Sequence, residues 1–256
     1  MATTAANTAH PNAGKPTVIC VFCGAHKGTS PAHLASARAL AHIFHKANIT
    51  LVYGGGTGGI MGELARTLVS LSGPKAVHGV IPTALVKIEN GYRTSLTATD
   101  SQLGGKAPER VVIMSDNGGD AGKAEGGGQL GESEYGLTTL VPDMHTRKRI
   151  MAQKVMDGGP GSGFVTLAGG FGTLEEAMEM VTWNQLGIHD CGIVLLNIDG
   201  YWDGLLQWVE KSVESGFVNK ANKGILVECR SVDEVLGALR NYRLSEGRYT
   251  LDWKST

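Results

Sequence analysis

Short apolar runs alternate with longer segments of helical periodicity along most of this 256-residue chain. The runs lack a polar residue at every second position, which indicates strands buried on both faces, as in a parallel sheet. Repeated strand–helix units join such strands through right-handed crossovers. The pattern predicts a single α/β domain with a doubly wound, mainly parallel, Rossmann-like sheet. The expected strands are 17–23, 49–53, 76–81, 163–168, 191–197 and 224–228, and the expected helices are 31–47, 60–72, 144–157, 174–186, 202–215 and 232–240.

Two segments depart from this alternation. Residues 1–15 are mostly Ala, Thr, Asn and Pro, which fits neither a secretory signal nor a transit peptide, and we expect a disordered tail. Residues 91–135 contain the glycine-rich stretches 116–120 and 126–128, and such composition buries little apolar surface. We expect a partly mobile insertion loop there, with a short strand at 110–114. The predicted domain therefore covers residues 16–256.

Charge and cysteine content exclude several classes of protein. The formal net charge is −1 and the pI is about 6.7, which gives no electrostatic footprint for nucleic acid or an anionic membrane. No apolar stretch approaches the ~20 residues that span a bilayer, so we expect a cytoplasmic protein. Cys20 and Cys23 share one apolar run and face opposite sides of a strand. This predicts buried structural cysteines rather than a zinc site or a disulfide framework.

Glycine-rich turns follow three of the apolar runs. GGGTGGIM covers residues 54–61, GGFGTLEE covers 169–176, and a third turn covers 23–28. Ligands of doubly wound sheets bind beyond the carboxyl ends of the strands, and glycine N–H groups at a helix N-terminus hold anions. Residues 54–59 formally match a dinucleotide fingerprint, but no acid stands at the end of the next strand. A tight structural turn and a mononucleotide site both remain open for them, whereas the missing Gly-Lys-Ser/Thr excludes a P-loop hydrolase.

Acidic residues follow the second of these turns. Thr173 and Glu176 have the spacing of a capping box, with Thr173 as the N-cap, just as Asp143 and Ser231 are expected to cap other helices. A helix N-terminus also lowers the pKa of a carboxyl group, so we expect an ionised Glu176 suited to act as a base or to stabilise a cation. Glu179 is expected on a solvated face.

A basic run, MHTRKR, opens the helix expected at 144–157. Cations in a first turn oppose the helix dipole, which suggests an anionic ligand or facing carboxylates rather than plain solvation. We expect His145 in this run to be a structural histidine rather than a catalytic one.

The motifs together resemble the LONELY GUY family of cytokinin-activating phosphoribohydrolases. Residues 169–176 are similar to the family signature PGGxGTxxE, and residues 144–148 are similar to its MHxRK motif. The likeness continues through 54–61, 80–82, 182–189 and 195–202, within most of 17–220. Ala168 replaces the proline of the signature, which affects the rigidity of the loop more than its chemistry. The insertion near 91–135 is also unlike the compact plant enzymes.

The resemblance implies hydrolysis of the N-glycosidic bond of a nucleoside 5′-monophosphate, without a metal or organic cofactor, by a homodimer or a higher homo-oligomer. Breaking this bond builds positive charge on the ribose, which nearby carboxylates stabilise. By resemblance, Arg147 and Glu176 carry catalysis and Glu175 binds the ribose hydroxyls. The implied substrate contacts are Gly24, Gly55, Glu89, Lys148, Gly169, Gly170, Phe171, Gly172, Thr173, Leu174, Glu175 and Thr182.

Two other classes of function remain open. Proteins that carry molybdenum cofactor share a similar fold, although paired acids give a carrier of an anionic ligand no advantage. A nicotinamide oxidoreductase is disfavoured because the acidic ribose partner is missing. A lysine decarboxylase would need a pyridoxal-binding lysine, which no motif marks. The preferred base, a cytokinin or plain adenine, is left undecided.

Overall fold

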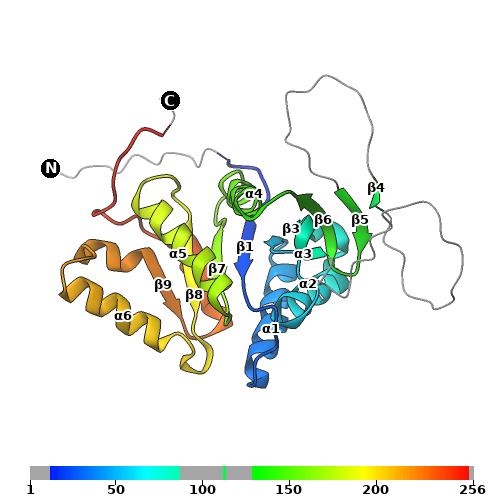
Figure 1. The fold of residues 1–256 in the computed structure, drawn as a ribbon, viewed down its shortest axis with the longest axis horizontal. Helices are drawn as coiled ribbons and strands as arrows, with labels where there is room; N and C mark the ends of the chain where they lie inside the picture. Colours follow the sequence, from blue (N-terminus) through cyan, green and yellow to red (C-terminus); the bar gives the residue numbers. More distant parts are fainter. Residues whose placement is uncertain (1–11, 87–111, 114–128, 254–256) are drawn as a thin grey trace, which may run out of the picture.

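The computed structural model describes residues 12–86, 112–113 and 129–253 (Figure 1). Within these residues one sheet contains nine strands, in the order β4-β5-β6-β3-β2-β1-β7-β8-β9. All neighbours from β6 to β9 are parallel, whereas β5 runs antiparallel to β4 and β6. The predicted mainly parallel α/β sheet is therefore confirmed. The strands are β1 (Val18–Phe22), β2 (Thr50–Tyr53), β3 (Val77–Pro82), β4 (Val112–Ile113), β5 (Gln129–Ser133), β6 (Gly136–Val141), β7 (Gly163–Thr166), β8 (Gly192–Leu196) and β9 (Leu226–Cys229).

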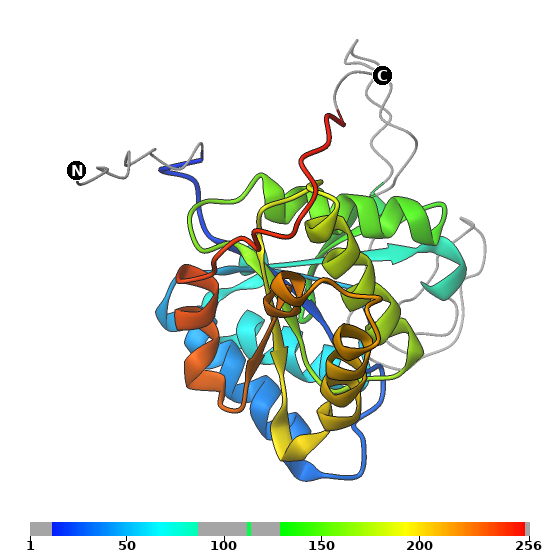
Figure 2. The same cartoon turned by 90° about the vertical axis from the view of Figure 1, so that its left-hand side faces the viewer.

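Helices cover both faces of the sheet and create two apolar cores. One core lies under α1, α2 and α7, with Leu40 and Leu64 fully buried in it. The other lies under α4, α5 and α6 and contains Met151 and Met180. Figure 2 shows the blue α1 and the gold α6 on opposite sides of the strands. The helices are α1 (Pro31–Lys46), α2 (Gly59–Ser72), α3 (Thr83–Val86), α4 (Met144–Met156), α5 (Phe171–Gln185), α6 (Asp203–Glu214) and α7 (Val235–Arg240).

The cysteines on β1 and just after it take the predicted positions. Cys20 belongs to the core under α4–α6, and Cys23 belongs to the core under α1 and α2. Both are buried and free, and burial raises the pKa of each thiol above its ordinary value. The structural role predicted for this pair is confirmed.

The order in which the strands are added to the sheet reverses beside β1. From β1 the chain passes through α1 and α2 to β2 and β3, and α4 then returns it to β7 on the other flank of β1. Figure 1 shows β1 in the middle, with β3 and β6 on one side and β7–β9 on the other. The crevice between the carboxyl ends of β1 and β7 is therefore the topological switch point, where such sheets bind ligands.

Two of the three predicted N-caps are confirmed. Asp143 caps α4 because its carboxylate accepts a hydrogen bond from the Thr146 N–H at 2.8 Å. Ser231 caps the short 3₁₀ turn before α7. The prediction for Thr173 is wrong, because α5 already begins at Phe171 and Gly170 is its N-cap. Thr173 is buried in the first turn instead, where a Cβ on Gly169 would lie 2.1 Å from its Oγ1.

The sequence prediction missed a hairpin at the end of the expected insertion. The strand expected at 110–114 is present as β4, but β5 and β6 lie where a loop was expected and beyond it. Ser133 Oγ accepts the Tyr135 N–H at 3.1 Å in the turn, and Gly136 adopts a φ of +90° that favours glycine. The threonines of β6 concealed this strand, because the adjacent Thr138 and Thr139 interrupt the continuous apolar run that marks the other parallel strands.

The two ends of the domain are only partly described. Residues 1–11 of the expected tail lie outside the described residues, but Asn12 Nδ2 donates a hydrogen bond to the Met156 carbonyl at 3.0 Å. Residues 12–15 therefore run against the C-terminal end of α4. The division into a tail at 1–15 and a domain at 16–256 stays a prediction.

Two helical glycines make a matched pair for testing the packing of the α2 N-terminus. A Cβ on Gly62 would lie 2.0 Å from the Thr57 carbonyl oxygen, whereas a Cβ on Gly237 in α7 would meet nothing within 4 Å. We expect Gly62→Ala to lower the free energy of unfolding by about 1–3 kcal/mol. Gly237→Ala should raise it by about 0.5–1 kcal/mol. Urea unfolding of both variants decides this, and equal effects would contradict the packing described.

The buried His189 predicts acid sensitivity of the fold. Its Nε2 donates to the Met180 carbonyl at 2.9 Å and its Nδ1 accepts the Cys191 N–H at 3.2 Å, so the neutral ring satisfies both contacts. Burial lowers the pKa of His189 to about 4. The His189 ring therefore gains its second proton near pH 6.5 in the unfolded chain and near pH 4 in the folded chain. This contribution to stability is therefore lost as the pH falls from 6.5 to 4, by up to about 1.4 kcal/mol per pH unit.

We expect His189→Gln to show a shallower loss of unfolding free energy between pH 7 and pH 4.5 than the wild type. His145→Gln, a change at an exposed histidine, serves as the control and should follow the wild type. Parallel curves for all three proteins would contradict the assignment.

Candidate active site

Three loops meet at the carboxyl ends of β1, β2 and β7. Gly24, just after β1, donates its N–H to the Ala168 carbonyl at 3.0 Å. Its own carbonyl accepts the N–H groups of Ile60 and Met61 at 3.1 and 3.3 Å. Gly24 therefore ties the loop after β1 to the other two. Ala168, which replaces the signature proline, is buried and uses only its backbone oxygen in this junction.

A cavity of about 450 Å³ lies between the loop after β1 and the loop after β7. A Cβ on Gly170 or Gly172 would meet nothing within 4 Å, so the space in front of the α5 N-terminus is open. The first N–H groups of a helix have no partner inside the helix, and here they face this open space as donors for an anion. The residues that line the cavity are Gly24, Ala25, His26, Gly28, Thr29, His33, Ile60, Ala168, Gly169, Gly170 and Tyr201.

A buried ion pair joins α4 to α5 beside these loops. Arg147 Nη2 lies 3.2 Å from Glu176 Oε1, and the two side chains are only 10% and 8% exposed. Within the described part of the chain, Arg147 Nε and Glu176 Oε1 have no hydrogen-bond partner. Buried charges that lack full satisfaction are costly, so this pair is weak as a stabilising element and is typical of a functional site.

Glu176 differs from the sequence prediction in two respects. It is the sixth residue of α5 and faces α4, so it forms no capping box with Thr173. Its pKa is raised by burial, with Arg147 acting in the opposite direction, whereas the sequence predicted a lowered value. The physical reason is position, because the influence of the helix dipole falls off beyond the first turn.

A second cluster of charges joins Lys148, the residue after Arg147 on α4, to Glu175 and Glu179 of α5. The Lys148 side chain is 9% exposed and forms ion pairs with Glu175 and, at 3.2 Å, with Glu179. Burial disfavours the charge on Lys148, but the hydrogen bonds that its ammonium group donates to the two carboxylates outweigh this effect and raise the pKa of the group. The basic run suggested an anionic ligand or facing carboxylates, and the structure shows the facing carboxylates. The prediction of a solvated Glu179 is wrong, because its side chain is only 24% exposed and paired.

The first glycine turn makes room for Arg147. A Cβ on Gly54 would lie 1.8 Å from Arg147 Nη2, so any side chain there would displace the guanidinium. Gly55 has a φ of +75°, and its Cβ would lie 3.0 Å from the Cβ of Ile81 at the end of β3. Gly54 thus shapes the site directly, whereas Gly55 is required by the backbone conformation of the turn.

The remaining predicted residues are spread around these groups. Phe171 is 96% exposed at the start of α5, and Leu174 packs against the core under α4–α6. Thr182 is exposed and donates its hydroxyl to the Met178 carbonyl at 2.8 Å. It lies seven residues beyond Glu175, roughly 10 Å along the helix, so the structure does not bring it to Glu175. Glu89 lies outside the described residues.

Two residues near the cavity were missed by the sequence prediction. Tyr201 donates its hydroxyl to the Gly169 carbonyl, and Asn197 organises the turn that carries Tyr201. Both lie in the segment 195–202, whose likeness to the family was noted without a role. Only the tertiary contact between this segment and the glycine loop reveals their position.

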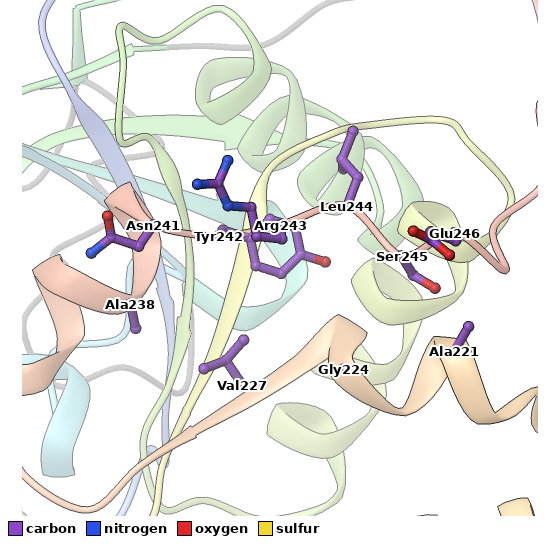
Figure 3. A pocket seen from close by; sticks show the side chains of 10 residues that line it. All are labelled: Ala221, Gly224, Val227, Ala238, Asn241, Tyr242, Arg243, Leu244, Ser245 and Glu246. Carbon is purple, nitrogen blue, oxygen red and sulfur yellow. The ribbon is translucent and has the colours of Figure 1, made fainter. Parts of the chain in front are cut away.

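A separate cavity of about 510 Å³ lies beside β9 and α7, and none of the motif residues lines it. Figure 3 shows the side chains that line this cavity. Among the described residues, no cluster of three His, Cys, Asp or Glu side chains is placed to hold a metal ion. Within the same ranges, no helix is both long and apolar enough to cross a membrane.

Comparison with known proteins identifies relatives over nearly the whole chain. A protein of Fusarium pseudograminearum, named bifunctional cytokinin biosynthesis protein, is 44% identical over 95% of this chain, which spans only 44% of its length. A cytokinin riboside 5′-monophosphate phosphoribohydrolase of Arabidopsis thaliana is 33% identical over 88% of this chain and 83% of its own. A probable enzyme of the same name from Oryza sativa is 35% identical over 88% of this chain and 77% of its own.

Solved structures with the same fold belong to proteins of a different description. The molybdenum cofactor carrier protein of Chlamydomonas reinhardtii superposes with a TM-score of 0.52 at 15% identity, over 88% of this chain and 97% of its own. The molybdenum cofactor binding protein of Rippkaea orientalis gives 0.51 at 14% identity, over 88% and 96%. At this level of identity the likeness concerns the fold alone.

The family model described as possible lysine decarboxylase matches residues 61–239. This range includes both charged helix starts and the second glycine turn. Together with the identity to the plant phosphoribohydrolases, the match places the chain in the LONELY GUY family, which carries that older description.

Proposed function

We propose that this protein hydrolyses the N-glycosidic bond of N6-substituted adenosine 5′-monophosphates and releases the free base and ribose 5-phosphate. The observation that carries this proposal is the buried Arg147–Glu176 pair between α4 and α5, together with the open, glycine-lined cavity at the N-terminus of α5. The names of the relatives from Arabidopsis and Fusarium support a cytokinin nucleotide as substrate. Plain AMP is the competing substrate, because it shares the phosphate, the ribose and the purine.

The 5′-phosphate would bind at the N-terminus of α5. Gly170 and Gly172 leave the backbone there accessible, Gly169 makes room for the Thr173 side chain, and the helix dipole favours a negative charge. The loop after β1 closes the opposite side of the cavity through Gly24. A phosphate held at this point directs the ribose toward the carboxylates in the following turns of α5.

Glu176 and Arg147 would carry the chemistry. Departure of the base leaves oxocarbenium character on the ribose, which a fixed carboxylate in a water-poor site stabilises strongly. Glu176 would provide this carboxylate and activate the attacking water, since its raised pKa brings proton exchange closer to neutral pH. Arg147 would lie near the leaving base and hold Glu176 in place.

Glu175 would bind the ribose hydroxyls, and Lys148 would position it. The Lys148 ammonium group contacts Glu175 and Glu179 at once, so it holds the two carboxylates on one side of α5. Glu175 keeps a half-exposed side chain and can turn an oxygen toward a ligand. We also propose that the protein acts as a cytoplasmic homodimer, as the family resemblance implies.

A non-enzymatic carrier of an anionic cofactor is the alternative, favoured by the fold of the two molybdenum cofactor proteins. The three carboxylates on the first turns of α5 argue against it, because they would repel a highly anionic ligand. Copurification of a pterin with the protein would support the carrier.

The direct test is release of base from a panel of nucleotides. We expect the wild type to release adenine from AMP or isopentenyladenine from its riboside monophosphate. Glu176→Gln should lower kcat at least about 100-fold, because it removes the carboxylate at the ribose and keeps the shape of the side chain. Glu214→Gln, the same change at a surface ion pair, serves as the control and should leave kcat unchanged. Equal release by the wild type and Glu176→Gln would overturn the proposal.

Gly54→Ala tests the role of Arg147 without changing a charge. The added methyl group would displace the guanidinium of Arg147 from its place beside Glu176. A displaced catalytic group should lower kcat roughly 10- to 100-fold. Gly204→Ala, where a Cβ meets nothing within 4 Å, serves as the control.

The losses of kcat caused by Gly54→Ala and by Arg147→Ala should not add, because both changes act through the Arg147 side chain. In an Arg147→Ala background, Gly54→Ala should therefore cause no further loss of kcat. A full additional loss in that background would show that Gly54 acts through something other than Arg147.

A further inference from the structure

The segment after β8 brings a tyrosine to the glycine loop. Tyr201 donates its hydroxyl hydrogen bond to the carbonyl of Gly169, 32 residues earlier in the chain. Its side chain also lines the cavity in front of α5. The contact therefore joins the wall of the cavity to the peptide that connects Gly169 to Gly170.

This contact determines where one N–H group points. In a trans peptide the carbonyl and the following N–H point in opposite directions, so holding the Gly169 oxygen also fixes the Gly170 N–H. Two successive glycines offer little resistance to rotation of the peptide between them. A Cβ on Gly170 would meet nothing within 4 Å, so packing against this residue does not restrict it. The loop needs an external contact to keep one orientation.

The tyrosine is itself held by a rigid turn. Asn197 Oδ1 accepts the Trp202 N–H at 2.8 Å, and Asn197 Nδ2 donates to Asp203 and Glu228 at 2.7 and 2.8 Å. Asp199, inside the turn, adopts a φ of +54°, which is uncommon for a residue other than glycine. Such strain persists only where the surrounding structure holds it.

Two further contacts restrict the Tyr201 ring and the turn. The ring packs edge-on against His33 and Trp202, with centroids 5.5 and 4.8 Å apart. Ser30, the N-cap of α1, donates its hydroxyl to Asp199 at 3.0 Å. The turn is thus anchored to the loop after β1 as well as to β9, and it presents the hydroxyl in a defined place.

We propose that Tyr201 is a positioning residue that holds the Gly169–Gly170 peptide in the orientation that binds the 5′-phosphate of the substrate. The inference rests on the proposed function. Tyr201 acts on the phosphate end of the substrate, which does not change during cleavage of the glycosidic bond. Its contribution is therefore equal in the ground state and the transition state, and it affects KM rather than kcat.

The test is Tyr201→Phe, which keeps the ring and its edge-on contacts and removes only the hydroxyl. We expect KM for the nucleotide to rise roughly five- to tenfold, as for the loss of one hydrogen bond, with kcat unchanged. The Kd of ribose 5-phosphate, measured by calorimetry, should rise by the same factor, whereas the Kd of adenine should not change. Tyr249→Phe, at an exposed tyrosine, is the matched control and should resemble the wild type.

The outcomes separate this inference from the proposed function. If Tyr201→Phe left the Kd of ribose 5-phosphate unchanged, the inference would be overturned. It would also be overturned if the variant lowered kcat and weakened adenine binding by the same factor as ribose 5-phosphate binding, because this would indicate a general structural role. If the wild type released no base but bound ribose 5-phosphate more tightly than Tyr201→Phe, the inference would stand and the proposed reaction would fail. A wild type that binds no ribose 5-phosphate would overturn the inference as well.

Discussion

The site depends on the reversal of strand order beside β1. Because β2 and β7 flank β1 and the chain proceeds away from it in both directions, the loops after β1 and β7 face each other with no strand between them. Gly24 then joins these loops by backbone hydrogen bonds. The α5 N-terminus, the open cavity and the tyrosine turn are all placed by this crevice.

Opposed charges on α4 and α5 complete the arrangement. Cations in the first turn of α4 oppose its dipole, yet the carboxylates of α5 face them across a short gap. Burial works against both charges of the Arg147–Glu176 pair, and nothing within the described residues satisfies Glu176 Oε1 by a hydrogen bond. A site of this kind is maintained by the packing around it, including the space that Gly54 leaves, and it gives the fold little net stability.

The sequence predicted correctly those elements whose structure depends on neighbouring residues. The parallel strands that are buried on both faces have continuous apolar sequences, which predicted them. Asp143 caps α4, as the chemistry of its side chain predicts. The prediction failed where longer-range packing decides. β6 carries two adjacent threonines in place of a continuous apolar run, and its pairing with β3 holds it in the sheet. Thr173 has the chemistry of an N-cap, but the preceding glycines allow α5 to start three residues earlier than expected.

By itself, the sequence determined the α/β class, the three glycine turns at strand ends, the opposed charged motifs and the family. These follow from side-chain periodicity and motif spacing, which are properties of short segments. Only the tertiary structure decided that Glu176 is buried with a raised pKa, that Glu179 is paired with Lys148, and that Tyr201 holds the Gly169 carbonyl. The reason is that burial and partner identity depend on residues distant in the chain, whose approach is set by how the helices pack on the sheet.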